Sequence, residues 1–95
     1  MGLIVQKFGG TSVKDRDRIF NVARIVANTR NQGNDVVVVV SAQGDTTDDL
    51  ITKAAEITSD PSHREMDMLL ATGEQISISL LAMALNELGC HAISL

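Results

Sequence analysis

Apolar residues along this 95-residue chain form two short continuous runs, each followed by a polar loop and then by apolar residues at helical spacing. The first run lies within Leu3–Phe8, and the second is the five consecutive valines of Val36–Val40. An uninterrupted β-branched run is typical of a parallel-sheet strand that is buried on both faces beneath helices. We therefore predict an α/β fold in which helices flank a parallel sheet.

Four stretches carry apolar residues at the spacing of one helix face. We predict a helix from Val13 to about Gln32 that Gly33 ends, with Asp15 and Asp17 in its first turn. Its predicted apolar face consists of Ile19, Val22, Ala23, Val26 and Ala27.

A second predicted helix follows the polar loop 41–48 and ends before the turn at residues 59–62. Its apolar face would be Leu50, Ile51, Ala54, Ala55 and Ile57. Two more helical segments, His63–Thr72 and Glu74–Leu88, are predicted on either side of Gly73, with Gly89 as the stop of the second. Their apolar faces would be Met66, Leu69 and Leu70, and then Ile76, Leu80, Leu81, Met83, Ala84 and Leu88.

The last residues, Cys90–Leu95, are largely apolar and predict the start of a third strand. A strand of a two-sided sheet needs neighbours, so we expect residues 1–95 to be the leading part of one larger domain. The alternative is that residues 90–95 close a compact three-stranded α/β sandwich, which leaves little core per residue.

The charge and composition of the chain indicate which kinds of molecule it can bind. Eight basic and twelve acidic residues give a net charge of −4, which argues against a nucleic-acid surface or a polybasic membrane patch and favours a small-molecule partner. The N-terminus does not resemble a signal peptide, and we find no apolar run that approaches a membrane span, so we expect a cytosolic protein. Cys90 is the only cysteine and is expected to be a buried structural thiol, and His63 is expected to be a solvated surface residue.

The motif KFGGTS, Lys7–Ser12, joins the first strand to the first helix. Glycines allow the backbone N–H groups to approach an oxyanion, and a lysine supplies a mobile positive charge, so the motif indicates phosphate binding. It is neither a Walker A loop nor a dinucleotide-binding GxGxxG. The alternative is a tight strand-to-helix turn in which Thr11 or Ser12 caps the helix.

Two other segments carry candidate chemistry. The loop SAQGDTTDD, residues 41–49, follows the valine strand, and the carboxyl ends of parallel strands share one edge of a sheet, so this loop should lie beside KFGGTS. Its hydroxyl groups, on Ser41, Thr46 and Thr47, could hold phosphate or carboxylate oxygens; alternatively, Thr47 or Asp48 only caps a helix. Glu74, directly after Gly73, could contact a ligand or simply interact favourably with a helix dipole.

KFGGTS, the valine strand running into SAQGDTTD, and REMDMLLATGEQ, residues 64–75, together resemble the aspartate kinases of the amino-acid kinase family. The resemblance covers essentially the whole chain and implies the N-terminal part of a three-layer αβα catalytic domain, without the regulatory domains of that family. It implies phosphorylation of the side-chain carboxylate of L-aspartate by ATP, the first step of lysine, threonine and methionine synthesis. By the same resemblance, Lys7 would be catalytic, ATP would be bound by Lys7, Phe8, Gly9, Gly10 and Ser41, and aspartate would be bound by Thr47 and Glu74.

Several expectations follow from that resemblance. Aspartate is already a carboxylate at neutral pH, so its phosphorylation needs no general base and depends on positioning and charge neutralisation. Mg²⁺ would arrive with ATP, without metal ligands from this chain, and the full-length protein would be a homo-oligomer. The 95-residue chain alone should be inactive and bind ATP weakly. The alternatives are a nonenzymatic α/β module that binds a phosphate ligand, and another member of the amino-acid kinase family.

Overall fold

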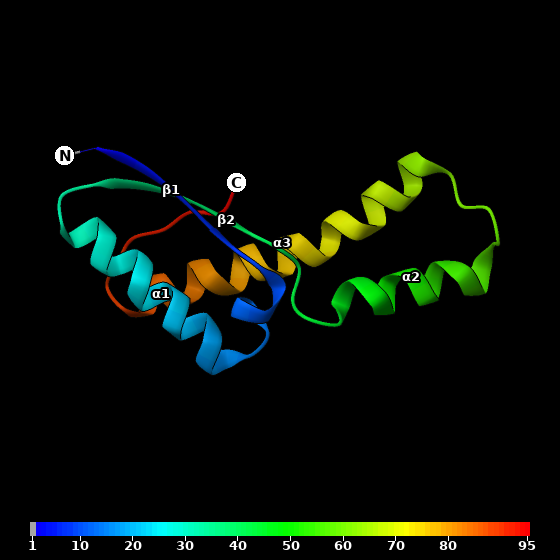
Figure 1. Ribbon diagram of the computed structural model, residues 1–95, viewed down its shortest axis with the longest axis horizontal. Helices are drawn as coiled ribbons and strands as arrows, with labels where there is room; N and C mark the ends of the chain where they lie inside the picture. The colour runs from blue at the N-terminus through cyan, green and yellow to red at the C-terminus, as the bar shows by residue number, and fades with distance from the viewer. Residues whose placement is uncertain (1) are drawn as a thin grey trace.

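The computed structural model describes residues 2–95, which form two strands, a short 3₁₀ helix and three α-helices (Figure 1). In chain order these elements are β1 (Leu3–Phe8), η1 (Gly10–Val13), α1 (Arg16–Asn31), β2 (Asp35–Val40), α2 (Thr46–Ile57) and α3 (His63–Glu87). Both strands were predicted from the sequence, and β2 begins one residue earlier than the valine run.

The two strands pair in parallel, in a register that runs from Leu3 opposite Asp35 to Phe8 opposite Val40. Figure 1 shows α1 and α3 crossing beneath the same face of this small sheet. The predicted α/β class with a parallel sheet is therefore confirmed, and residues 2–95 supply two of the three expected layers.

The valine strand alternates between covered and exposed positions, because the helices of residues 2–95 cover only one face of the sheet. Val36 and Val38 pack against the core and Val40 is buried, whereas Val37 and Val39 are each 46% exposed. The prediction that this strand is buried on both faces is thus wrong for the described part of the chain. Side chains of a strand point alternately to opposite faces, so the outer face carries the unburied valines.

The core lies between α1, α3 and the inner face of the sheet. Four of the five residues predicted for the α1 face are buried, and Ala27 is half-buried. The remaining buried apolar residues are Val13, Val40, Leu81, Ala84 and Leu85. The predicted face of α3 is only partly right, because Ile76, Leu80, Met83 and Leu88 are exposed and the buried stripe runs instead through Gly73, Ser77, Leu81, Ala84 and Leu85.

Helix α1 begins at Arg16, three residues later than predicted, and its N-cap is Asp15. The prediction of Thr11 or Ser12 as the cap is wrong, because these residues belong to η1, which intervenes between β1 and α1. The predicted C-terminal glycines are confirmed: Gly33 (φ 91°) and Gly89 (φ 79°) both adopt the left-handed conformation that follows a helix end.

Helix α2 begins at Thr46, earlier than predicted, with Asp45 at its N-cap and no capping bond from a side chain. Thr47 and Asp48 are therefore residues of the first turn, and the prediction that one of them is the cap is wrong.

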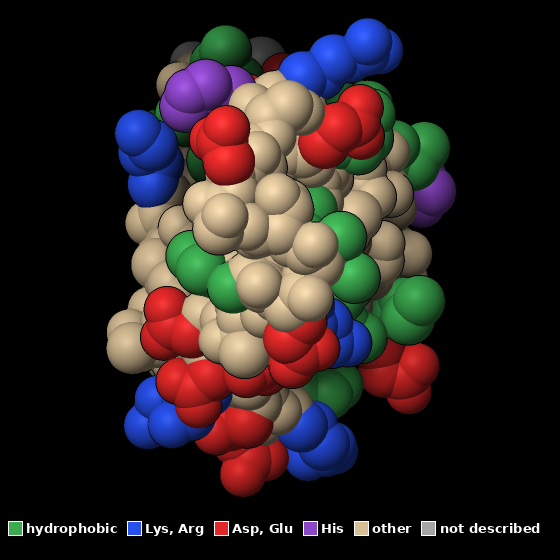
Figure 2. Space-filling model, turned by 90° about the vertical axis from the view of Figure 1, so that its right-hand side faces the viewer, with side chains coloured by type: hydrophobic (Ala, Val, Ile, Leu, Met, Phe, Trp, Pro, Cys, Tyr) green, Lys and Arg blue, Asp and Glu red, His purple; other side chains and the backbone are tan. Residues whose placement is uncertain are grey.

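With the N-terminal half of α3, α2 forms a hairpin that projects from the body of the molecule (Figure 1). Figure 2, viewed from this side, shows acidic and basic side chains gathered together over the lower half of the surface.

Helix α3 is one continuous helix of 25 residues, so the predicted break at Gly73 is wrong. Ser62 caps it, since its hydroxyl oxygen accepts a hydrogen bond of 3.3 Å from the Glu65 backbone N–H. By length and composition alone α3 could span a membrane, contrary to the sequence-based expectation, but it is also a core helix that packs on α1 and β2.

Residues 90–95 are not a strand, and the sheet of the described chain has two strands. This part of the prediction is wrong: the backbone of Ala92 bonds instead to the Asn86 side chain, its N–H donating to Oδ1 at 2.8 Å. Cys90 packs against the core but is only half-buried, less than predicted, and His63, the first residue of α3, is exposed as expected.

Candidate functional site

The loops that follow β1 and β2 are in direct contact at the carboxyl ends of the strands. The N–H of Ser41 donates to the Phe8 carbonyl at 3.1 Å, and the N–H of Gly44 donates to the Gly10 carbonyl, also at 3.1 Å. A Cβ placed on Gly10 would lie 2.6 Å from the Ala42 carbonyl oxygen, a distance that real Cβ atoms essentially never show. Gly10 is therefore needed so that the two loops can pack backbone to backbone.

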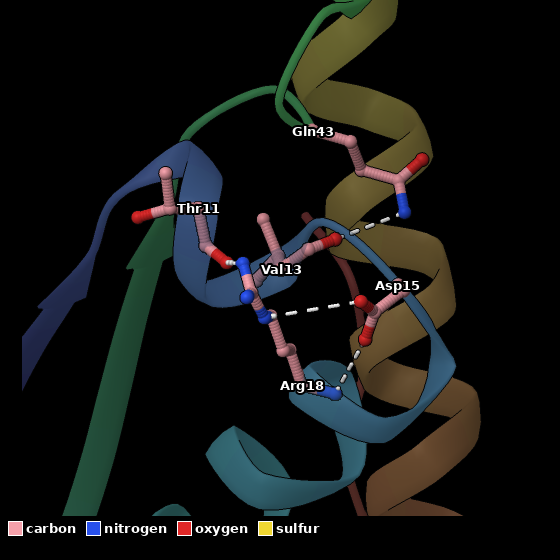
Figure 3. A network of polar contacts seen from close by, with 5 residues as sticks. All are labelled: Thr11, Val13, Asp15, Arg18 and Gln43. Atoms are coloured by element: carbon pink, nitrogen blue, oxygen red, sulfur yellow. Dashed lines mark hydrogen bonds and ion pairs between the residues drawn. The ribbon is translucent and has the colours of Figure 1, made fainter.

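The end of the first loop is fixed by a small polar network around Arg18 (Figure 3). The Arg18 guanidinium donates to the Thr11 carbonyl at 3.1 Å, and its backbone N–H donates to Asp15 Oδ1 at 2.9 Å. Arg18 Nε also lies 3.8 Å from Asp15 Oδ2. The N-cap of α1 thus also orients the arginine that holds the KFGGTS segment.

A side chain of the second loop completes the connection. Gln43 Nε2 donates to the Val13 carbonyl at 2.9 Å, across thirty residues of sequence (Figure 3). Val13 itself is fully buried, so this bond anchors the second loop to the core at the end of η1.

The third motif reaches the same place through Gly73 of α3. A Cβ placed on Gly73 would lie 3.0 Å from Ala42 Cβ and 3.3 Å from Thr46 Cγ2, closer than nearly all real Cβ contacts. The glycine therefore permits α3 to lie against both the second loop and the start of α2. Ala42 contacts Gly10 through its carbonyl and Gly73 through its Cβ, so the three sequence motifs meet at this one residue.

The residues predicted to bind ATP lie at the end of β1, in the first loop and directly after β2. Lys7 is exposed and belongs to none of the ion pairs formed within residues 2–95. Phe8 is half-buried and packs against the core, and its carbonyl oxygen accepts the Ser41 N–H. A Cβ on Gly9 would meet no atom within 4 Å, so open space borders the backbone two residues after Lys7, and Ser41 is exposed just after β2.

The residues predicted to bind aspartate belong to the second and third motifs. Thr47 and Glu74 are both exposed, in the first turn of α2 and in the middle of α3. Each directly follows a residue of the contact between Thr46 and Gly73. Backbone hydrogen bonds join the Lys7–Gly10 segment to the second loop, and Ala42 lies between this segment and the contact between Thr46 and Gly73.

Two residues near the site were missed by the sequence analysis. Gln43 links the loops, and Lys14 extends its side chain over Gly44, where a Cβ would lie 3.2 Å from Lys14 Cγ. A basic residue four positions after the glycine pair was a signal that could have identified Lys14. Within residues 2–95, no group of three acidic, cysteine or histidine side chains could hold a metal ion.

Comparisons with known proteins agree with this arrangement of motifs. The chain is 66% identical over 94 residues to the aspartokinase of Bacillus sp. (strain MGA3), and 62% identical over 95 residues to that of Geobacillus stearothermophilus. These alignments cover 99% and 100% of the chain but only 23% of each relative. Its structure is similar to the crystal structure of aspartate kinase from Synechocystis, with a TM-score of 0.95 and 57% identity over 98% of this chain and 16% of that one.

The chain therefore spans about a quarter of the length of the curated relatives that it matches. The Amino acid kinase family profile matches residues 2–95, all of the residues that the structure describes. The contacts between its three motifs, the parallel sheet and this match lead to one conclusion: the chain belongs to the amino acid kinase family.

Proposed function

We propose that this chain is the leading part of the catalytic domain of an aspartokinase and forms one wall of its active site. In this proposal the complete protein transfers the γ-phosphoryl group of ATP to the side-chain carboxylate of L-aspartate. The observation that carries the proposal is the meeting of KFGGTS, SAQGDTT and ATGEQ around Ala42. It supports a site in which KFGGTS would bind phosphate and the exposed residues Thr47 and Glu74 would bind an amino acid.

Lys7 has the chemistry needed at the phosphate side of the site. Its side chain is exposed and free of an ion-pair partner within the described chain, and open space borders the backbone of Gly9, two residues further along. An oxygen of the ATP triphosphate could approach both the Lys7 ammonium group and the Gly9 backbone. The barrier to attack by a carboxylate on a polyphosphate is largely charge repulsion, so a positive charge that follows the transferred group lowers it.

Ser41 and the backbone of Gly10 would complete the phosphate side. The N–H of Ser41 is used by the sheet, since it donates to Phe8, so its contribution to a nucleotide would come from the hydroxyl group. ATP would bring Mg²⁺ bound to its phosphates, and that ion would offset part of their negative charge.

Thr47 and Glu74 would bind the amino acid. The Glu74 carboxylate suits the ammonium group of aspartate, and the Thr47 hydroxyl can donate a hydrogen bond to a carboxylate oxygen. We assign no general base, because the nucleophilic carboxylate is ionised at neutral pH. Catalysis would then depend on alignment of the two substrates and on charge neutralisation.

The site formed by residues 2–95 is open on one side, and we expect the rest of the domain to supply the adenine pocket. The chain alone should accordingly bind ATP weakly and form no aspartyl phosphate. We expect the complete protein to be a cytosolic homo-oligomer in the biosynthesis of lysine, threonine and methionine. We expect it to bind neither nucleic acid nor membranes, since the net charge of this chain is −4.

The test uses a hybrid enzyme in which this chain replaces the matching segment of the Geobacillus stearothermophilus aspartokinase, to which it is 62% identical. Aspartyl phosphate, trapped with hydroxylamine, should form with the hybrid enzyme and MgATP but not with the 95-residue chain. A hybrid that folds but is inactive, while the unaltered Geobacillus stearothermophilus enzyme is active in the same assay, would contradict the proposal.

A nonenzymatic phosphate-binding module is the competing possibility, and titration calorimetry separates it from an enzyme. Binding of aspartate that is strengthened by a MgATP analogue in the hybrid enzyme, and is absent in the isolated chain, supports the kinase. Equal anion binding by both proteins, with no effect of aspartate, supports the module.

A further inference from the structure

We infer that Gly73 is a positioning residue: the absence of a side chain there fixes the distance of α3 from Ala42 and Thr46, and with it the position of the aspartate-binding residues. This inference rests on the proposed function, because it assigns Thr47 and Glu74 to the amino acid substrate. It concerns a residue that would itself touch neither substrate.

Glycine is a poor choice for the interior of a helix, so its presence at position 73 needs a reason. Among ordinary helix residues glycine is the least favourable because it loses the most backbone freedom. Yet α3 continues without a break through Gly73, which is buried. We attribute the glycine to the close packing against the second loop that it permits, which offsets its low helix propensity.

The contact leaves little room for a side chain at position 73. Ala42 Cβ and Thr46 Cγ2 would lie 3.0 Å and 3.3 Å from an added Cβ, and Leu50 Cδ1 would follow at 3.6 Å. Ser77, one turn further along α3, is also buried. A side chain at position 73 therefore requires α3 or the residues that it faces to shift by at least a few tenths of an ångström.

Ala42 has little freedom to give way. Its Cβ is fixed to the backbone and has no rotamer to change, and its carbonyl oxygen is held in contact with Gly10 on the first loop. The N–H of Gly44 bonds to the Gly10 carbonyl at 3.1 Å and holds the same segment in place. The displacement would then fall mainly on α3 and α2, which carry Glu74 and Thr47.

The consequence for catalysis is selective. In Gly73→Ala, the Michaelis constant for aspartate should rise at least about fivefold, because small displacements of groups that position a substrate have large effects. The Michaelis constant for ATP should change less, because Lys7–Gly10 and Ser41 are joined by backbone hydrogen bonds that do not involve α3.

The experiment is a double-mutant cycle in the hybrid enzyme with Gly73→Ala, Ala42→Gly and both changes together. Ala42→Gly removes the Cβ that the new methyl group would meet, so the double variant should recover most of the aspartate Michaelis constant. Gly10→Ala serves as the matched control for rescue, because it meets the Ala42 carbonyl oxygen at 2.6 Å, an atom that Ala42→Gly leaves in place. Gly2→Ala, whose Cβ would have 3.8 Å to its nearest neighbour, should leave the kinetics unchanged.

The outcomes separate this inference from the proposed function. An unchanged aspartate Michaelis constant in Gly73→Ala, or a raised one that Ala42→Gly does not restore, overturns the inference while the parent hybrid stays active. If the unmutated hybrid enzyme forms no aspartyl phosphate, the proposed function fails. The melting temperatures of the four proteins of the cycle, which are the unmutated hybrid, the two single variants and the double variant, still decide whether Gly73 and Ala42 are coupled. If Gly73→Ala does not fold, restored folding and aspartate binding in the double variant support the inference, and continued misfolding overturns it.

Discussion

Gln43 donates a hydrogen bond of 2.9 Å to the carbonyl oxygen of Val13, and this bond joins the two loops that follow the parallel strands. Val13 is fully buried, so its backbone cannot move freely to find another donor. The bond therefore fixes the second loop against the end of the first.

Replacing Gln43 with methionine tests this connection. Gln43→Met keeps the length of the side chain but removes the donor, so it should lower the free energy of unfolding by about 1 kcal/mol, the usual contribution of a hydrogen bond. Urea denaturation of the hybrid enzyme measures this change. Gln43→Glu can no longer donate and should be at least as destabilising at neutral pH; equal stability of all three proteins would argue that the bond contributes nothing.

Lys7 should affect the chemical step more than the binding of aspartate. In Lys7→Ala we expect turnover to fall by about 10²-fold or more, as when one transition-state donor is removed, with an aspartate Michaelis constant within about threefold of the parent. Steady-state kinetics of aspartyl phosphate formation provide both numbers. Lys7→Arg, which keeps the charge but changes its shape, should recover part of the turnover. Unchanged turnover in Lys7→Ala would remove Lys7 from the catalytic assignment.

Lys14 combines two separable contributions, since its stem covers Gly44 and places its charged end beside the second loop. Lys14→Met keeps an apolar stem and removes the charge, and Lys14→Ala removes both. The ATP Michaelis constant should rise about two- to fivefold in both variants, as expected for an exposed charge. Only Lys14→Ala should also lower the melting temperature. Identical melting temperatures would show that the stem does not stabilise the loop.

The cap of α1 should be replaceable by an amide but not by a methyl group. Asp15 Oδ1 accepts a hydrogen bond from the Arg18 N–H, so Asp15→Ala should cost about 1 kcal/mol of unfolding free energy. Asp15→Asn should retain most of it, because asparagine is an equally good N-cap. Chemical denaturation of the three proteins distinguishes the cap from the ion pair with Arg18, which both variants remove.

Local patterns in the sequence were sufficient for the strands and for the face of α1. The run Leu3–Phe8, the valine run and the spacing of Ile19, Val22 and Val26 each depend on periodicity that a short window contains. The two left-handed glycines at helix ends were predictable for the same reason.

The errors concern features that depend on residues distant in sequence. The local pattern around Gly73 predicts a helix break, but in the structure Gly73 lies against Ala42, thirty-one positions earlier in the chain, and no local pattern records that proximity. Residues 90–95 have the composition of a strand, but a strand also needs a partner for its backbone groups, and within residues 2–95 they pair with none. The predicted burial of the valine strand is too high for its outer face. Composition shows that both faces of the strand are apolar, but it does not show whether a helix packs on each of them.

The candidate site was predictable as a set of motifs but not as a geometry. Parallel strands place both loops on one edge of the sheet, so the proximity of KFGGTS and SAQGDTT followed from the fold class. The central place of Ala42 did not, because an alanine between a serine and a glutamine carries no chemical signal. It is found only when the backbone distances to Gly10 and Gly73 are known.

The two-stranded sheet also bears on how the 95-residue chain behaves in solution. Each strand has a neighbour on one side only, so β1 and β2 both expose a row of backbone donors and acceptors, beside an outer face with Leu3, Val5, Val37 and Val39. Such edges can recruit strands from other molecules. The isolated chain should therefore associate in a concentration-dependent way, and adding the proposed remainder of the domain as a separate polypeptide should reduce this association.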